Sequence, residues 1–403
     1  MSQTAEDARL SRTAAGTDPP PGTGTVALLV ATAMVVLTQL YAAIPLLGPV
    51  GEDLGGDVTF ALASCFSLCY AVGFLTWGPL ADQYGHKRAM AIGVSVLAVA
   101  TIGCAFAPST DWLAVWRGVQ GLAAASFAPA AVAYFAEALP PSRRPAAIGA
   151  LSIALLASGI VGQVLASWAA VTVGWPWLFL ASAIALAAAG AAIARSVRQP
   201  ARNAPRGHVG HRFVAVARVA TRRSVQLLCA ANATLLLSFV GMYTALGPHL
   251  DTLGLDESGV LWLRLVGLPG MFAALFAGRL ALRWGTAGAA RIGFTVAAYG
   301  LAGEAVMSGS LAGVCVASLV FVTGVAIVVP SMLTLFVEAA APDRAGGIGL
   351  NGFVMFLGAS LGPIVATATT NFTVLLLALA GLLAVAAWCI ATATKFAPSG
   401  ARP

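Results

Sequence analysis

Three charged side chains stand inside long apolar segments of the sequence, namely Arg117, Arg264 and Glu304. A charge in an apolar interior is costly unless it meets a cavity or a partner, so such residues are candidates for substrate binding or proton transfer. Arg264 could meet an anionic group of a substrate, although a structural role suits its position nearly as well. Glu304 lies near the end of its segment, where a structural role is favoured over proton transport.

No pattern for catalysis or ATP hydrolysis accompanies these charges. The chain has no GxxxxGK[ST] phosphate loop and no nucleophile elbow, and its histidines and cysteines show no metal-ligand spacing. All six cysteines lie in apolar runs and are expected to be small buried hydrophobic residues. We therefore expect neither an enzyme nor an ATP-driven pump, and no bound cofactor or metal.

Apolar segments dominate the chain, because 59% of its 403 residues are hydrophobic and only 9% are charged. A soluble domain has about 25% charged residues. About 20 apolar residues cross a bilayer, so the chain has room for roughly a dozen spans. Apolar runs between glycine, proline and charged residues predict twelve membrane helices, at 24–50, 58–80, 89–107, 112–137, 146–172, 177–194, 224–250, 258–280, 289–307, 311–338, 346–370 and 373–394.

Basic residues mark one side of this membrane protein. All Lys and Arg except Arg117 and Arg264 lie in the tails or at helix ends on one face, and the opposite loops hold acidic residues instead. By the positive-inside rule this face is cytoplasmic, so both termini are expected inside a bacterial-type cell membrane. The net charge of +7 is thus a topology signal, and nucleic acid is not an expected partner.

A loop with eight arginines and no acid divides the chain. It could dock on anionic lipid headgroups, but a cytoplasmic retention signal and linker is the favoured interpretation. The predicted parts are an N-terminal tail (1–23), a six-helix bundle (24–194), this linker (195–223), a second six-helix bundle (224–394) and a C-terminal tail (395–403).

The two halves also repeat each other in sequence. One block recurs at a shift of 200, with Gly78, Leu80, Ala81 and Gly85 returning as Gly278, Leu280, Ala281 and Gly285. Another recurs at a shift of 201, with Pro129, Phe135, Glu137 and Ala138 returning as Pro330, Phe336, Glu338 and Ala339. A duplicated six-helix unit is the simplest account of both blocks.

The first block includes a charged turn, Gly78-Pro79-Leu80-Ala81-Asp82-Gln83-Tyr84-Gly85-His86-Lys87-Arg88. Its glycines permit a tight turn, and an acid followed by cations can form a charge cluster that breaks and re-forms. The turn resembles the signature loop of the major facilitator superfamily, Gly-x-Leu-Ala-Asp-Arg-x-Gly-Arg-Lys, with Gln83 and His86 where the family prefers Arg. The resemblance implies the major facilitator fold, an all-α polytopic membrane protein whose 12 transmembrane helices form two six-helix bundles with pseudo-two-fold symmetry.

The same resemblance implies a conformational gate in this loop, formed by Gly78, Asp82, Gly85, Lys87 and Arg88. In the family the loop acid is thought to hold the outward-facing state by contacting the N-terminal end of helix 11, here near residues 346–349. A helix N-terminus carries partial positive charge, so this contact of Asp82 is physically sound. The second half has Leu282 at the matching position, so Asp82 would act alone.

Helix 4 carries a second motif, Arg117-Gly118-Val119-Gln120-Gly121, which resembles the family pattern Arg-x-x-Gln-Gly. In proton-coupled members the matching arginine is linked to proton transfer. The resemblance therefore assigns proton coupling to Arg117, Gln120 and Asp82. The alternative is that Arg117 only snorkels or holds neighbouring backbone carbonyls.

Small residues recur in helices 5 and 11, at Gly159, Gly162, Gly358 and Gly362, the last followed by Pro363. Such residues let membrane helices pack closely. Drug:proton antiporters resemble this pattern, with a signature ending Gly-Pro-x-x-Gly-Gly in helix 5. Here Gln163 replaces its proline, whereas helix 11 keeps the Gly-Pro pair. The resemblance favours antiport.

Cavities in this family are lined mainly by helices 1, 4, 7 and 10. The residues that we assign to a substrate cavity on this basis are Gln39, Tyr41, Arg117, Asn232, Tyr243 and Arg264. Helix 1 has no Asp or Glu and the deep charges include two arginines, which favours neutral or anionic amphiphiles over cations.

The sequence thus predicts a proton-coupled exporter of a drug, antibiotic or other small amphiphilic metabolite, working by alternating access as a monomer in the lipid bilayer. Its expected partners are the substrate and protons. One alternative is an uptake symporter or facilitator for a small organic anion or sugar. Another is a non-transporting membrane sensor or scaffold, which the intact gate residues argue against.

Overall fold

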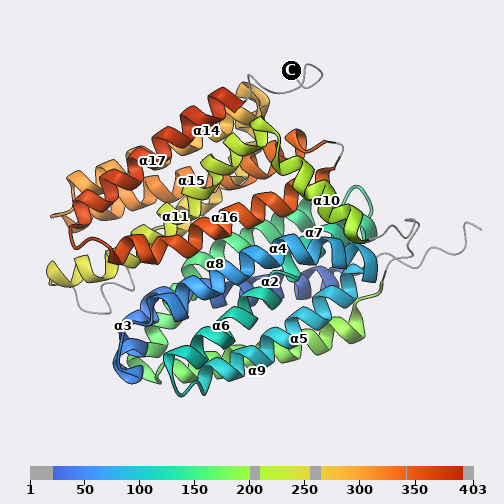
Figure 1. The fold of residues 1–403 in the computed structure, drawn as a ribbon, viewed down its shortest axis with the longest axis horizontal. Helices are drawn as coiled ribbons and strands as arrows, with labels where there is room; N and C mark the ends of the chain where they lie inside the picture. Colours follow the sequence, from blue (N-terminus) through green and yellow to red (C-terminus); the bar gives the residue numbers. More distant parts are fainter. Residues whose placement is uncertain (1–20, 200–208, 255–264, 342, 394–403) are drawn as a thin grey trace, which may run out of the picture.

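The computed structural model describes residues 21–199, 209–254, 265–341 and 343–393. In these residues all regular secondary structure is helical, and ten helices are long and apolar enough to cross a membrane. Figure 1 shows two groups of roughly parallel helices, blue to green for the N-terminal half and yellow to red for the C-terminal half. The predicted all-α polytopic architecture is confirmed.

The helices follow the predicted order along the chain. The N-terminal group contains α2 (Thr23–Tyr41), α3 (Ala43–Leu54), η1 (Thr59–Ser64), α4 (Cys65–Tyr84), α5 (His86–Ala105), α6 (Thr110–Ala124), α7 (Phe127–Ala138), α8 (Arg144–Thr172) and α9 (Trp175–Ser196). The C-terminal group contains α11 (Arg223–Thr252), α13 (Leu268–Met271), η2 (Phe272–Phe276), α14 (Ala277–Val306), α15 (Leu311–Ala339), α16 (Arg344–Thr367) and α17 (Phe372–Ala393).

Three predicted helices are interrupted in the structure. The first breaks at Ala42, whose N–H bonds to the Thr38 carbonyl (2.9 Å), and continues as α3. The second begins with η1, a six-residue π-helical segment. The fourth is divided into α6 and α7 by a turn at Ala125 and Ser126. Apolar residues continue through each break because both sides of it are buried, so apolar periodicity carries no sign of these boundaries.

The sequence repeat has a counterpart in the backbone. Gly85 ends α4 with φ +101°, and Gly285, 200 residues later, interrupts α14 with φ +72°. Glycine takes such angles without a steric penalty. The predicted helix at 258–280 lies partly outside the described residues, and its described part comprises α13, η2 and the start of α14.

Capping and packing repeat as well. The Ser109 hydroxyl accepts from the Trp112 N–H at the start of α6, and the Ser310 hydroxyl accepts from the Gly313 N–H at the start of α15, 201 residues later, both at 3.4 Å. Helix α8 packs on α2 in the first half, as α16 packs on α11 in the second. The two bundles are therefore copies of one unit.

The bundles meet through aromatic side chains on α4 and α16. Phe356 lies 4.4 Å from Tyr70 and 5.4 Å from Phe74 between ring centroids. Gly352 faces the Phe74 ring directly. A second contact joins α2 to α11, where Tyr41 meets Phe239 edge to face at 5.9 Å. Apolar contacts of this kind allow two rigid bodies to change their packing without breaking ion pairs.

The predicted linker contains a helix, α10 (Val209–Ala220), which packs against α16 and α4. A Cβ at Gly346 would meet Val216 of α10 at 3.4 Å. Arg222, just after α10, donates to the carbonyls of Ala339 (2.8 Å) and Ala341 (2.9 Å) at the end of α15. The linker therefore covers the start of α16 and caps the end of α15.

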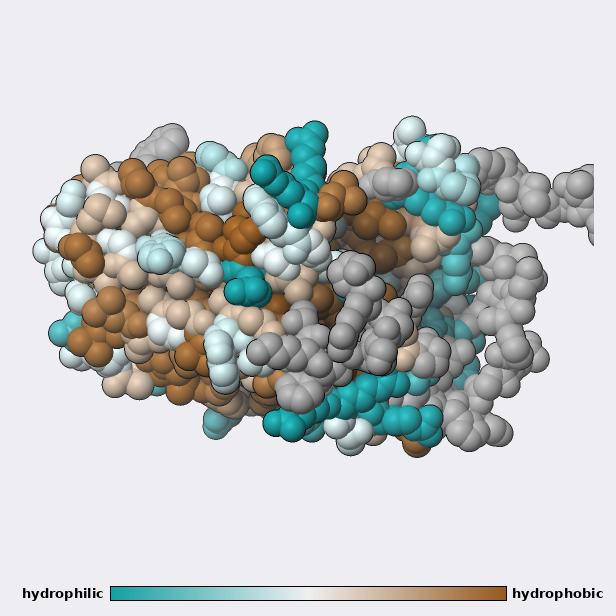
Figure 2. Space-filling model, turned by 90° about the horizontal axis from the view of Figure 1, so that it is seen from above, coloured by the Kyte–Doolittle hydropathy of each residue, from teal (hydrophilic) through white to brown (hydrophobic). Residues whose placement is uncertain are grey.

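The surface of the bundles is suited to lipid. Many large apolar side chains on the outer helices are exposed, including Val99 on α5, Tyr299 on α14 and Trp388 on α17. Figure 2 shows brown and pale residues over much of the visible face, with most hydrophilic residues in its right-hand half. An apolar band with polar residues gathered toward one end is what a membrane-spanning bundle requires.

Candidate functional site

Two interrupted helices in the N-terminal bundle turn backbone carbonyls toward a common point. The break after α2 leaves the Gln39 carbonyl to accept from a side chain, and the π-helical segment η1 does the same for the Leu62 carbonyl. Single-turn π-helical segments are rare and frequently occur at functional sites. Both carbonyls need a donor because water does not reach them.

Arg117 on α6 is that donor. Its Nε donates to the Leu62 carbonyl (2.7 Å), and its Nη1 donates to the Gln39 carbonyl (3.0 Å) and to Gln120 Oε1 (2.8 Å). Gln120 Nε2 in turn donates to the Thr101 hydroxyl on α5 (2.8 Å). The Phe66 ring of α4 covers the guanidinium at 4.5 Å.

This network joins four of the six N-terminal spans around one charge. Arg117 and Gln120 are both fully buried, so neither faces an open cavity in this conformation. Among the described residues, Arg117 Nη2 has no hydrogen-bond acceptor and no carboxylate bonds the guanidinium. In this conformation Arg117 thus forms a clamp on carbonyls of α2 and η1, and its part in proton coupling stays a prediction.

The loop after α4 is held by two contacts within the N-terminal half. His86 Nε2 lies 3.1 Å from Glu137 Oε1 at the end of α7. The Lys87 N–H donates to Gln199 Oε1 (3.1 Å), beyond the end of α9, and the Gln199 side chain also fills the space beside Gly85. His86 thus has a partner although the family pattern has Arg at this position.

The remaining gate residues lie on α4 and at the start of α5. Gly78 and Asp82 are on the last turns of α4 and are half-buried, while Lys87 is half-buried and Arg88 exposed. The structure brings α4 beside α16, and a Cβ at Gly349 would meet the Phe74 carbonyl oxygen at 3.3 Å. The helix that carries Asp82 therefore runs alongside α16, with α10 against both of them, and the contact of Asp82 itself with residues 346–349 stays a prediction.

Two predicted cavity residues, Tyr41 and Tyr243, lie at the boundary between the bundles. The Phe239 ring contacts Tyr41 at 5.9 Å and Tyr243 at 4.9 Å. Gly159 of α8 faces Tyr41, Phe239 and Met271, each within 3.7 Å of a Cβ built on it. The side chain of Gln39 turns to the Val35 carbonyl of its own helix (3.3 Å). These residues form an aromatic cluster, which we define as Tyr41, Phe239, Tyr243 and Met271 around Gly159.

Asn232 connects helices rather than lining open space. Its Nδ2 donates to the backbone carbonyl (2.8 Å) and to Oδ1 (3.2 Å) of Asn351 on α16, and the side chain is fully buried. Asn351 was not among the predicted residues, and a second amide in an apolar helix is the signal that could have found it. Arg264 lies outside the described residues.

The glycines of helices 5 and 11 lie at close helix crossings. A Cβ at Gly162 would come 3.0 Å from the Thr38 carbonyl of α2, and one at Gly362 would come 2.9 Å from the Gly241 nitrogen of α11. Gly358 faces the Ala233 carbonyl even more closely. Pro363 lies inside α16, directly after Gly362. The predicted packing role agrees with these contacts, which the sequence repeat relates to each other. In the first half α8 packs on α2, and in the second half α16 packs on α11.

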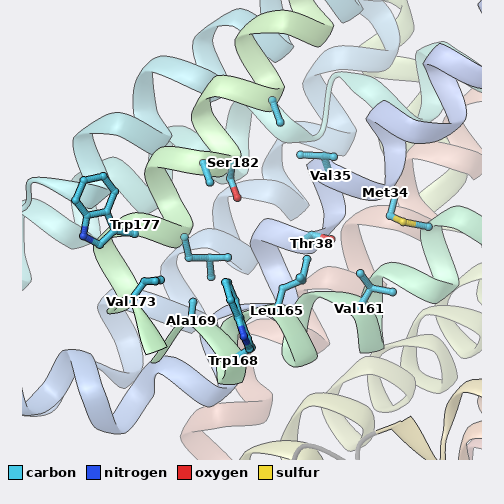
Figure 3. Close-up of a pocket in the computed structure, with 13 residues that line it drawn as sticks. Met34, Val35, Thr38, Val161, Leu165, Trp168, Ala169, Val173, Trp177 and Ser182 are labelled. Atoms are coloured by element: carbon cyan, nitrogen blue, oxygen red, sulfur yellow. The ribbon is translucent and has the colours of Figure 1, made fainter. Parts of the chain in front are cut away.

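An apolar cavity of about 660 Å³ lies between α2, α8 and α9, and sequence reasoning did not anticipate it. Figure 3 shows Met34 and Thr38, Leu165 and Trp168, and Trp177 turned toward this space from the three helices. The rest of its lining is Val35, Val161, Ala169, Val173, Leu178, Ala181, Ser182 and Ala185. Apart from hydroxyls and indole nitrogens the lining is apolar. In the described residues no group of His, Cys, Asp or Glu could hold a metal ion.

The family model of the Major Facilitator Superfamily matches residues 29–363. The chain belongs to the Major Facilitator Superfamily. A solved structure of a bacterial homologue of the human lysosomal transporter Spinster, inward-facing and occupied, superposes with a TM-score of 0.70. The match covers 94% of this chain and 98% of that chain at 15% identity, so it shows the shared fold.

Curated relatives match over part of their length. The multidrug export protein EmrB of Haemophilus influenzae is 29% identical over 160 residues, which cover 38% of this chain and 31% of EmrB. The tetracenomycin C resistance and export protein of Streptomyces glaucescens is 29% identical over 157 residues, covering 38% of this chain and 29% of that protein. The alignments thus span about a third of these relatives. The protein is a multi-pass membrane transporter of this superfamily rather than an enzyme.

Proposed function

We propose that this transporter exports small amphiphilic compounds, such as a drug, an antibiotic or a related metabolite, across the bacterial plasma membrane in exchange for protons. It works as a monomer by alternating access, with both termini in the cytoplasm. The names of the relatives support export, since one is called a multidrug export protein and another a resistance and export protein. The positive-inside charge pattern supports the orientation.

One observation carries the substrate class. The aromatic cluster between the bundles is uncharged and offers ring faces and edges, with the Tyr41 and Tyr243 hydroxyls as its polar groups. When the bundles rotate, these side chains separate and become the walls of a cavity. Such walls suit a flat, largely apolar molecule with a few polar groups, and they suit a sugar or a small inorganic ion poorly.

The N-terminal network provides the link between helix 1 and the gate in this proposal. Arg117, which is bonded to Gln120, holds the Gln39 carbonyl at the break in helix 1, two residues before Tyr41 of the aromatic cluster. A proton that alters this network would change the angle between α2 and α3 and so the position of Tyr41. Asp82, with Gly78, Gly85, Lys87 and Arg88, would set the preference between inward-facing and outward-facing states.

The test uses inside-out membrane vesicles that contain the protein and a pH-sensitive dye, with an acidic interior. A cationic, a neutral and an anionic amphiphile (ethidium, chloramphenicol and taurocholate) are added in turn. We expect proton release into the medium on addition of a substrate, together with substrate accumulation inside. Asp82→Asn should abolish both signals, whereas the matched control Asp111→Asn, an exposed acid at the opposite end of the bundle, should leave them unchanged.

The result that overturns the proposal is equally specific. Substrate that equilibrates across the membrane without proton movement would replace the antiporter by a facilitator. Accumulation of substrate in right-side-out vesicles with inward proton flow would replace it by an uptake symporter.

A further inference from the structure

Glu304 on α14 is an acid that the proposed mechanism does not use. Its side chain has 0% exposure, and neither carboxyl oxygen has a hydrogen-bond partner among the described residues. The hydroxyl of Ser318 on α15 lies next to the carboxyl and also makes no hydrogen bond of ordinary geometry there. A buried polar group without a partner in the apolar interior needs an explanation.

The position of Glu304 is related by the internal repeat to the Arg117 network. A shift of 200 takes Cys104, near the end of α5, to Glu304, and a shift of 201 takes Arg117 to Ser318. Cys104 is a close neighbour of Arg117, just as Glu304 is a close neighbour of Ser318. Each bundle therefore has a buried ionisable side chain at the equivalent helix crossing: the Arg117 cation at the crossing of α5 and α6 in the first half, and the Glu304 acid at the crossing of α14 and α15 in the second.

The two sites differ in the hydrogen-bond partners that surround the ionisable group. Arg117 has carbonyl acceptors because helices 1 and 2 are interrupted beside it. Around Glu304 the packing is closed, since Gly300 lies against the backbone of Phe321 and a Cβ at Gly303 would be 3.7 Å from Ala317. No helix break supplies donors to this carboxyl in the described residues.

No described positive charge faces Glu304 from the elements packed against α14. On α15 the titratable neighbour is Cys315, and on α17 the titratable residue is Cys389, toward the other end of that helix. The segments α13 and η2 contain no ionisable residue. On α14 itself the nearest cation, Arg291, is 13 residues away, or about 20 Å along a helix. An ionised Glu304 would thus be uncompensated, so the carboxyl is neutral in this conformation.

A histidine lies near the end of α14 that carries Glu304. His249 at the end of α11 lies 2.9 Å from the Ser308 carbonyl, four residues beyond Glu304, and its ring stacks on Phe372 at 4.1 Å. This histidine is half-buried, at the junction of α11, the segment between α14 and α15, and the start of α17.

We propose that Glu304 is a proton-binding site in the C-terminal bundle, occupied in this conformation and emptied when the contact between α14 and α15 opens to water. Its ligand is the proton, and its polar neighbour is Ser318. The link of this site to transport rests on the proposed antiport, whereas the binding of the proton does not. In the exchange, the carboxyl takes up its proton from water on the outer side and releases it to water that is continuous with the cytoplasmic side.

The first experiment measures protonation directly. Infrared spectra of the purified protein in lipid nanodiscs are recorded at about pH 7, where an exposed Glu is ionised. We expect a neutral carboxyl C=O band in the wild type that is absent in Glu304→Gln. The matched control Glu137→Gln, an exposed acid at the cytoplasmic end, should keep the band. Identical C=O regions in the wild type and in Glu304→Gln would overturn the proposal.

The second experiment measures coupling in the vesicle assay described above. Glu304→Gln mimics the neutral acid, so the variant should fold and exchange labelled for unlabelled substrate like the wild type. We expect its substrate-driven proton release to fall at least tenfold, and release equal to the wild type would overturn the role of Glu304 in coupling. If the wild type releases no protons, the proposed antiport is refuted. The infrared band still tests the protonation of Glu304, because that measurement does not depend on transport.

Discussion

Replacing Arg117 by methionine removes a buried charge and leaves its acceptors without donors. Three hydrogen bonds are lost, to the carbonyls of Leu62 and Gln39 and to the Gln120 side chain. A hydrogen bond to a charged group contributes about 1.5 to 3 kcal/mol. Methionine fills similar volume and no longer has a guanidinium to desolvate, which offsets part of the loss. Removing one partner of a buried charged interaction typically costs about 3 to 5 kcal/mol, and we expect a loss in that range.

The assay is equilibrium unfolding of the purified protein in mixed micelles, followed by tryptophan fluorescence. A loss of about 3 to 5 kcal/mol raises the unfolding constant roughly 10² to 10³·⁵-fold. Arg143→Met is the matched control, because Arg143 is half-buried and makes one bond, to the Pro21 carbonyl (3.2 Å). It should cost about 1 kcal/mol or less. If Arg117→Met destabilised the protein no more than Arg143→Met, the clamp would be refuted.

A double-mutant cycle isolates one bond of the clamp. Gln120→Leu removes the acceptor of Arg117 Nη1 and the donor to Thr101. Because the two residues share a network, the effects of Arg117→Met and Gln120→Leu should fall short of additivity by about 1 to 2 kcal/mol. Additive effects would mean that Gln120 contributes independently of Arg117.

Three further outcomes follow from the structure. Gly358→Ala should prevent accumulation of folded protein, because its Cβ would strike the Ala233 carbonyl, whereas Gly381→Ala, with open space around it, should be tolerated in the same expression and gel-filtration assay. Hydrogen bonds from Thr59 hold the pKa of Asp57 below its ordinary value, so Asp57 stabilises the fold above that value. The stability difference between wild type and Asp57→Ala should vanish as pH falls below about 4 in pH-dependent unfolding. Phe356→Ala should shift the balance between conformations, measured by the distance between spin labels on the two bundles, and no shift would contradict the role of the α4–α16 contact.

Apolar length and charge distribution predicted most of the fold because they are local properties of the chain. A run of about 20 apolar residues must form a helix in lipid, since its backbone groups have no other partner there. The repeat at shifts of 200 and 201 also reads directly from residue types, and it reappears as the positive φ of Gly85 and Gly285.

The helix interruptions escaped prediction because they depend on partners far away in sequence. The breaks at Ala42 and in η1 are stabilised by Arg117, 75 and about 55 residues later. Helix α10 within the predicted linker was missed for the same reason, because its contacts are with α4 and α16. The apolar cavity of Figure 3 likewise arises from three helices that are separated in the chain.

The sequence alone determined that this is a membrane protein with a duplicated bundle, a basic face and a family signature loop, because composition, spacing and repeats do not depend on packing. It also singled out Arg117 and Glu304 as charges in apolar segments. Only the tertiary structure decided that Arg117 has hydrogen-bond acceptors and that neither carboxyl oxygen of Glu304 has a hydrogen-bond partner in the described residues. The energy of a buried charge is set by the groups within a few ångströms of it, and those groups come together only when the helices pack.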